Sequence, residues 1–137
     1  MRRRTKARES ALKVLYQIEM TKDAPSEALH IYWQREHESD SSVKGFTQQL
    51  VEGVIEHKTE IDKLISEHAK NWQIDRMAVV DKNILRMATF EMLYADDIPV
   101  KVSINEAIDI AKKYGDTDSG KFVNGILDKI SKIKTKT

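Results

Sequence analysis

Apolar residues recur along this chain at intervals of three or four positions, the spacing that places them on one face of an α-helix. Alternation of apolar and polar residues, which strands show, is nearly absent, and the 137 residues include two prolines and five glycines. We therefore predict an all-α protein of about seven helices. Because the connections are short, we expect sequence neighbours to pack antiparallel in two small bundles that divide near residue 58.

Capping motifs, glycine and proline indicate where these helices begin and end. The segments 59–62 (Thr-Glu-Ile-Asp) and 103–106 (Ser-Ile-Asn-Glu) are typical of helix starts, because the first hydroxyl can accept a bond from a backbone N–H of the first turn. Pro99 predicts an extended connection before the second segment, and Gly115 ends the helix after it. The expected helices cover about residues 5–20, 26–38, 43–55, 61–68 (before Trp72), 76–95, 103–114 and 119–133.

The fifth expected helix has apolar residues on more than one side, so we expect it to be the most enclosed. Two charged residues, Asp81 and Arg86, interrupt it. A buried charge without a partner is strongly destabilising, so we expect an acid to pair with Arg86 and choose Glu106 near the start of the next helix. Asp81 has two open interpretations, a structural role or a contact with a protein partner.

Residues 115–121 read Gly-Asp-Thr-Asp-Ser-Gly-Lys, which matches most of a phosphate-binding loop. Such a loop follows a strand and ends in a hydroxyl, but the preceding segment is helical by its spacing and Phe122 occupies the hydroxyl position. The two aspartates in the loop would also repel phosphate. We therefore predict a turn between helices, with Asp118 or Ser119 as the N-cap. Phe122 is either a core residue or a partly exposed stacking platform beside Lys121.

The net charge of +1 hides an uneven distribution along the chain. The first eight residues carry five bases and no acid, and we call these bases the basic arm: Arg2, Arg3, Arg4, Lys6 and Arg8. The last nine residues carry the lysines Lys129, Lys132, Lys134 and Lys136. Basic ends favour a polyanionic partner. We interpret the basic arm as a binding element and the lysines as a solvated helix end.

Several functional classes are disfavoured by the residue content. The chain has no cysteine, and its four histidines fit no metal-ligand spacing. Motifs of hydrolases, metalloproteases and dinucleotide-binding enzymes are absent, as are a secretory signal and an apolar run of the roughly 18 residues that a membrane span requires. We expect no catalytic residue, no metal, no cofactor and a location in the cytoplasm.

The basic arm leads into a helix that carries an aromatic residue, Tyr16. Arg8 lies two turns before Tyr16, so both can share one edge of the helix. Basic side chains that follow a phosphate backbone, with a ring that stacks on bases, are typical of proteins that bind unpaired strands. Periodicity alone slightly favours a core position for Tyr16, and both interpretations stay open.

Three segments of the chain carry a family resemblance. They are KARESALKVLYQIEM, VDKNILRMATFEMLY and DIPVKVSINEAIDIAKKYGDTDSGKFVNGILDKI, preceded by the basic arm. With them the chain resembles the NusB family of bacterial transcription antitermination factors across nearly its whole length, whereas residues 22–75 carry little that is diagnostic.

The resemblance implies one RNA-binding domain over residues 1–137, built of two three-helix bundles over about residues 1–57 and 58–137. It implies binding of single-stranded boxA-like RNA in ribosomal RNA leader transcripts, together with the small-subunit ribosomal protein NusE, within an RNA polymerase antitermination complex. Asp81 stands where the family usually has glutamate, which shortens the reach toward the partner. The expected partner contacts are Tyr16 and Asp81, and the expected RNA contacts are Arg2, Arg3, Arg4, Lys6, Arg8, Tyr16, Asp118, Lys121 and Phe122.

Two alternatives remain after this interpretation. A helical protein–protein module with basic ends would need no RNA, and a steep loss of RNA affinity with salt would distinguish RNA binding from it. The NusB module also precedes a methyltransferase domain in other chains, but the length of this chain and its lack of cysteine disfavour an enzyme. Whether the free protein is a monomer or a homodimer stays open.

Overall fold

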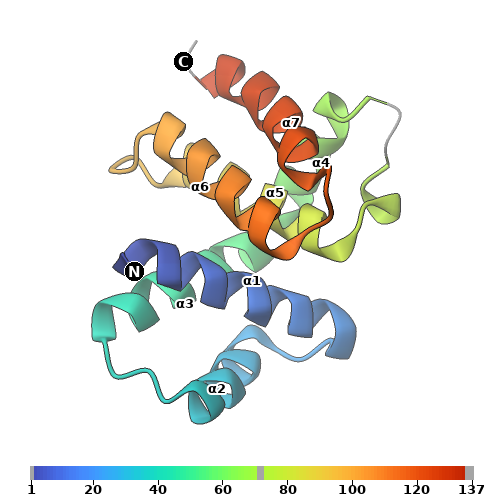
Figure 1. The fold of residues 1–137 in the computed structure, drawn as a ribbon. Coiled ribbons are helices and arrows are strands. Elements are labelled where there is room, and N and C mark those ends of the chain that lie inside the picture. The colour runs from blue at the N-terminus through green and yellow to red at the C-terminus, as the bar shows by residue number, and fades with distance from the viewer. Residues whose placement is uncertain (1, 71–72, 135–137) are drawn as a thin grey trace. The chain divides into compact units, whose positions relative to one another are not determined.

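The computed structural model describes residues 2–70 and 73–134, and Trp72 and Lys136 lie outside these ranges. The described residues form seven α-helices and one short 3-10 helix and contain no strand, so the all-α prediction is confirmed (Figure 1). The chain divides into two compact units, Met1–Glu56 and His57–Thr137. That both units belong to one RNA-binding domain stays a prediction.

The first unit is a bundle of three helices, α1 (Arg3–Thr21), α2 (Pro25–Glu36) and α3 (Ser41–Glu56). Helix α1 packs most extensively against α3 and less against α2. The buried hydroxyl of Thr47 on α3 donates to the backbone oxygen of Ala7 on α1 at 3.2 Å, which ties these two helices together. The core of the unit consists of Ala7, Ala11, Leu12, Val14, Leu15, Ala28, Leu29, Val43, Phe46, Leu50, Val51 and Val54.

The second unit contains α4 (Lys58–His68), the 3-10 helix η1 (Ile74–Arg76), α5 (Val79–Tyr94), α6 (Val100–Tyr114) and α7 (Ser119–Lys134). The resemblance implies a bundle of three helices here, and the structure has four α-helices. Helix α5 packs against α4, α6 and α7, and every residue from Lys82 to Met92 is buried. The prediction of an enclosed fifth helix is therefore confirmed. Among the described residues, no helix combines the length and apolarity needed to cross a membrane.

Both predicted capping boxes are wrong. Helix α4 begins at Lys58, and its N-cap makes no side-chain hydrogen bond. Helix α6 begins at Val100, directly after Pro99, because the fixed φ of proline (−59°) suits a helix start. Ser103 therefore lies inside α6, where its buried hydroxyl donates to Glu91 Oε1 on α5 at 2.8 Å. A contact between two helices has taken the hydroxyl that the motif assigns to a cap.

Gly115 ends α6 as predicted, but for a different reason than backbone freedom. Its φ is −97°, outside the left-handed region that favours glycine. A Cβ atom at this position would lie 2.8 Å from the backbone oxygen of Ala111, closer than such atoms approach. Close approach of the chain to itself thus requires glycine here.

Arg86 has an acidic partner that the sequence did not indicate. Asp62 on α4 accepts hydrogen bonds from Arg86 Nε at 2.7 Å and Nη2 at 2.9 Å, a bidentate ion pair. Arg86 also donates to Asn83 Oδ1 at 3.2 Å. Glu106, the acid chosen from the sequence, is itself buried. The pair with Asp62 fixes α4 against α5.

Candidate nucleic-acid interface

The basic arm lies at the N-terminal end of α1. Arg2 is the N-cap, in extended conformation (φ −66°, ψ 143°), and its backbone oxygen accepts the N–H of Lys6 at 3.0 Å. Arg2, Arg3, Arg4 and Lys6 are exposed, as the RNA interpretation requires. Arg8 is 4% exposed, so it differs from the rest of the arm. Its predicted RNA contact stays a prediction, and its burial favours a structural role.

Arg4 and Arg8 both lie against the ring of Phe46 on α3. The guanidinium carbons are 4.4 Å (Arg4) and 5.4 Å (Arg8) from the ring centroid, within the range of cation–π attraction. The two arginines are one helical turn apart, so one ring serves both. Phe46 thereby orients this side of the arm, a role that no local pattern in the sequence indicates.

Arg3 and Lys6 pair with the loop between α2 and α3, which we call the acidic loop (residues 37–40). Arg3 Nε lies 3.0 Å from Asp40 Oδ2, and Lys6 Nζ forms an ion pair with Glu38 Oε1. The bond to Glu38 raises the pKa of Lys6 above its usual 10.5. The same bond, followed by the N–H of Asp40, lowers the pKa of Glu38.

Asp40 has two tasks, one for each carboxylate oxygen. Oδ1 accepts the backbone N–H of Ser42 at 2.9 Å and its hydroxyl at 2.6 Å, and so caps the start of α3. Oδ2 binds Arg3. The pKa of Asp40 is lowered, chiefly by the hydroxyl and N–H of Ser42 and to a smaller extent by Arg3.

Tyr16 is 45% exposed, so the core position that periodicity slightly favoured is wrong. Met20, one turn further along α1, is 51% exposed. The two side chains form an apolar stripe on the solvent side of the helix. An exposed tyrosine ring is available for stacking or for a protein contact, and its part in either stays a prediction.

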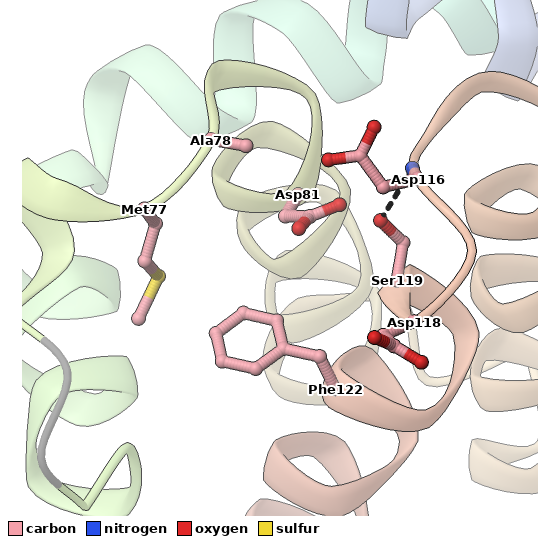
Figure 2. Close-up of a pocket in the computed structure, with 7 residues that line it drawn as sticks. All are labelled: Met77, Ala78, Asp81, Asp116, Asp118, Ser119 and Phe122. Atoms are coloured by element: carbon pink, nitrogen blue, oxygen red, sulfur yellow. Dashed lines mark hydrogen bonds between the residues drawn. The ribbon is translucent and has the colours of Figure 1, made fainter.

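A second group of candidate residues lines a pocket of ≈ 370 Å³ in the second unit (Figure 2). Asp81, at the start of α5, and Asp118 and Phe122, at the start of α7, are brought together here. Lys121 is exposed on the first turn of α7 but does not line the pocket. Sequence reasoning missed four lining residues, which also flank helix starts: Met77, Ala78, Asp116 and Ser119.

The predicted turn between α6 and α7 is confirmed, and its hydrogen bonds explain its shape. The N–H of Asp116 donates to Ser119 Oγ at 2.9 Å, and the N–H of Phe122 donates to the backbone oxygen of Asp118 at 3.0 Å. Figure 2 shows the Phe122 ring reaching into the pocket toward the side of Met77. Phe122 is partly buried, between the two interpretations that the sequence left open.

Asp81 contributes an unsatisfied oxygen to this pocket. Its Oδ1 atom is buried and has no hydrogen-bond partner among the described residues. A carboxylate at a helix start is favoured by the helix dipole, which explains why it is tolerated. A buried acceptor without a donor is nevertheless destabilising, so a molecule that supplies a donor here gains a hydrogen bond. Within residues 2–70 and 73–134, no group of three or more candidate ligands could hold a metal ion.

The lysines near the C-terminus form no comparable element among the described residues. Lys129 and Lys132 are exposed on α7, and Lys132 lies 3.4 Å from Asp128 one turn before it. This arrangement agrees with the interpretation of a solvated helix end.

Comparison with known proteins identifies the family. The model of the NusB family matches residues 5–132. The chain belongs to the NusB family. A curated relative, the "Transcription antitermination protein NusB" of Bacillus velezensis, is 51% identical over 136 residues, which make up 98% of this chain and 97% of the relative. The resemblance seen in the three sequence segments is thereby confirmed.

Solved structures of NusB family members share the fold over the whole chain. NusB of T. maritima has a TM-score of 0.85 and 38% identity, covering 100% of this chain and 99% of that one. A structure described as "Crystal Structure of Antitermination Factors NusB and NusE in complex with dsRNA" has a TM-score of 0.89 and 31% identity, covering 97% of this chain and 98% of that one. The likeness to NusB structures therefore includes the residues of the first unit and those of the second.

Proposed function

We propose that this chain is a non-enzymatic transcription antitermination factor that acts in the cytoplasm. It binds boxA-like single-stranded RNA of ribosomal RNA leader transcripts together with the ribosomal protein NusE, as part of an RNA polymerase antitermination complex. The observation that carries the proposal is the likeness to the NusB chain solved with NusE and dsRNA. The residues of both units supply the chemistry that such binding needs.

The basic arm supplies the charge for RNA phosphates. Arg2, Arg3, Arg4 and Lys6 are exposed over the first two turns of one helix, so they can follow a strand. Each cation that neutralises a phosphate releases bound counterions, which favours binding at low salt. The exposed ring of Tyr16 on the same helix offers a surface on which a base can stack.

The pocket supplies groups that can distinguish bases. The partly buried ring of Phe122 can stack on a base, and Lys121 next to it can bind a phosphate. Asp118 is exposed, and a carboxylate accepts hydrogen bonds from amino groups such as that of cytosine. Its negative charge disfavours phosphate, so its contact with RNA is to a base.

Asp81 supplies a contact for the protein partner. Its buried, unsatisfied Oδ1 favours a donor from NusE, such as an arginine or lysine side chain. Tyr16 offers the partner apolar surface and a hydroxyl. Asp81→Ala is therefore expected to weaken the binding of NusE, and to weaken RNA binding more in the presence of NusE than by the isolated chain.

The salt dependence of RNA binding tests the basic arm. Replacement of Arg2, Arg3 and Arg4 by alanine is expected to weaken binding of a labelled boxA-like oligonucleotide and to reduce the slope of log K against log salt by about two, since each single-strand contact contributes about 0.7. Fluorescence anisotropy over a salt series, with and without NusE, measures both quantities.

A matched control removes three exposed lysines elsewhere, by alanine replacement of Lys101, Lys129 and Lys132. This variant has the same net charge as the arginine variant but should keep the parent slope. Equal affinity of the arginine variant and the parent would favour the alternative function, a protein–protein module without specific RNA binding.

Phe122→Asp tests the pocket. Loss of a stacking ring lowers affinity by about 1–3 kcal/mol, or about 5- to 150-fold. Because Phe122 is only partly buried, the melting temperature of the Phe122→Asp protein should be only slightly lower than that of the parent. A collapse of thermal stability with no separate loss of RNA affinity would assign Phe122 to the core.

A further inference from the structure

The acidic loop holds two bases of the proposed RNA-binding arm with carboxylates that are themselves fixed in place. Glu38 accepts the backbone N–H of Asp40 at 3.0 Å, and its side chain is 10% exposed. Asp40 is held by its bonds at the start of α3. The partner bases are far more exposed, 53% for Lys6 and 76% for Arg3. The acids are therefore the fixed side of each pair, and the bases are the movable side.

We propose that Glu38 and Asp40 are specificity-determining residues that compete with RNA phosphates for Lys6 and Arg3. An RNA that offers phosphates alone must displace these carboxylates, whereas an RNA that also makes base contacts gains enough to do so. The acidic loop thus lowers affinity for unrelated RNA more than it lowers affinity for the correct RNA. This inference rests on the proposed function.

Electrostatics favours competition between the carboxylates and RNA phosphates over a role of the carboxylates in positioning the arm for RNA. Once a phosphate takes Lys6 or Arg3, the carboxylate stays nearby, because its own loop holds it, and repels the newly bound anion. Arg4 of the same arm lies over the Phe46 ring, and this ring has no net charge that would repel a bound phosphate.

The expected size of the effect follows from the exposure of the pairs. Exposed ion pairs of this kind change an equilibrium by up to about fivefold each. Removal of both competitors should therefore tighten binding of unrelated RNA by about 2- to 25-fold at low salt. Each base released to neutralise a phosphate should steepen the salt slope by about 0.7.

The test uses substitutions that remove charge and keep the hydrogen bonds. Glu38→Gln can still accept the N–H of Asp40, and Asp40→Asn can still cap α3, since asparagine is a good N-cap. The control is Glu27→Gln/Asp109→Asn, which removes the same two charges at exposed positions, one in the first turn of α2 and one on α6. Binding of a labelled single-stranded RNA of unrelated sequence and of a boxA-like RNA is measured over a salt series, after circular dichroism has verified folding.

Tighter binding of unrelated RNA by the double variant Glu38→Gln/Asp40→Asn than by the control double variant, with a steeper slope, supports the proposal. Affinity equal to the control, or weaker than the parent, overturns it, because weaker binding would mean that the acids help to position the arm. If the double variant does not fold, the single variants Glu38→Gln and Glu27→Gln provide the same comparison.

A second probe separates this inference from the proposed function. Salt-gradient elution from immobilised heparin, a sulfated polyanion, needs no RNA specificity. If the parent binds neither RNA, the proposed function fails, but later elution of Glu38→Gln/Asp40→Asn than of the control Glu27→Gln/Asp109→Asn still supports competition by the acidic loop. Coincident elution overturns it.

Discussion

The ion pair between Arg86 and Asp62 gives a quantitative prediction for the stability of the second unit. Arg86 is 7% exposed and Asp62 21%, and two hydrogen bonds of 2.7 and 2.9 Å join them. Removing one partner of a buried pair costs about 3–5 kcal/mol. Asp62 is partly exposed and the bond to Asn83 remains, so we expect Asp62→Ala to lower the free energy of unfolding by about 2–3 kcal/mol.

Urea denaturation followed by circular dichroism measures this loss. A double-mutant cycle isolates the pair: Arg86→Met removes the buried charge, so Asp62→Ala should cost at least about 1 kcal/mol less in that background. The control is Asp128→Ala, which breaks an exposed pair with Lys132 and should change stability by less than about 0.5 kcal/mol. A loss for Asp62→Ala as small as for this control would refute the assignment of a buried, stabilising pair.

Further predictions concern the acidic loop and two glycines. The lowered pKa values of Glu38 and Asp40 mean that their contribution to stability is complete above their usual values of 4.5 and 3.8 and is lost as the pH falls through the lower folded-state values. Unfolding midpoints between about pH 6 and pH 2 should therefore fall less steeply for Glu38→Gln than for the parent, and identical profiles would contradict this. Gly115→Ala should destabilise the protein by about 1–3 kcal/mol, because the added methyl group meets the oxygen of Ala111. Gly125→Ala, with nothing within 4 Å on α7, should stabilise it by up to about 1 kcal/mol, so calorimetric shifts of the same sign for both glycines would argue against the contact.

The helices could be predicted because their apolar spacing is a repeated signal. In α5, apolar residues on several sides predict an enclosed helix, and the structure buries all of Lys82–Met92. The turn at residues 115–118 could be separated from a phosphate-binding loop because several independent features disagreed with that motif. Predictions that rest on several residues at once were thus the ones that held.

Helix starts could not be predicted as well, because a hydroxyl can bond either locally or across helices. Ser103 begins a complete capping motif, yet its hydroxyl binds Glu91 of the preceding helix. The burial of Tyr16 could not be predicted from the sequence either. Helical spacing gives the direction of a side chain around α1, but it does not say how far the neighbouring helices cover that direction.

The candidate site could be predicted by residue type but not by its contacts. Five bases in eight residues indicate an anion-binding element without any knowledge of the fold. Their partners Glu38, Asp40 and Phe46 lie more than thirty positions away, and no local pattern connects them with the arm. For the same reason nothing in the sequence separates Arg8, which is buried, from its exposed neighbours.

The enclosure of α5 has a consequence for hydrogen exchange. Water reaches the backbone amides of Lys82–Met92 only when the surrounding helices separate, so these hydrogens should be among the slowest to exchange with deuterated solvent. The first turn of α1 is exposed, and its amides exchange by local fraying. A polyanion bound at the arm would slow amide exchange in that first turn. The exchange rate in α5 would still be set by unfolding of the second unit. Exchange rates therefore separate the part of the chain that recognises a ligand from the part that holds the fold.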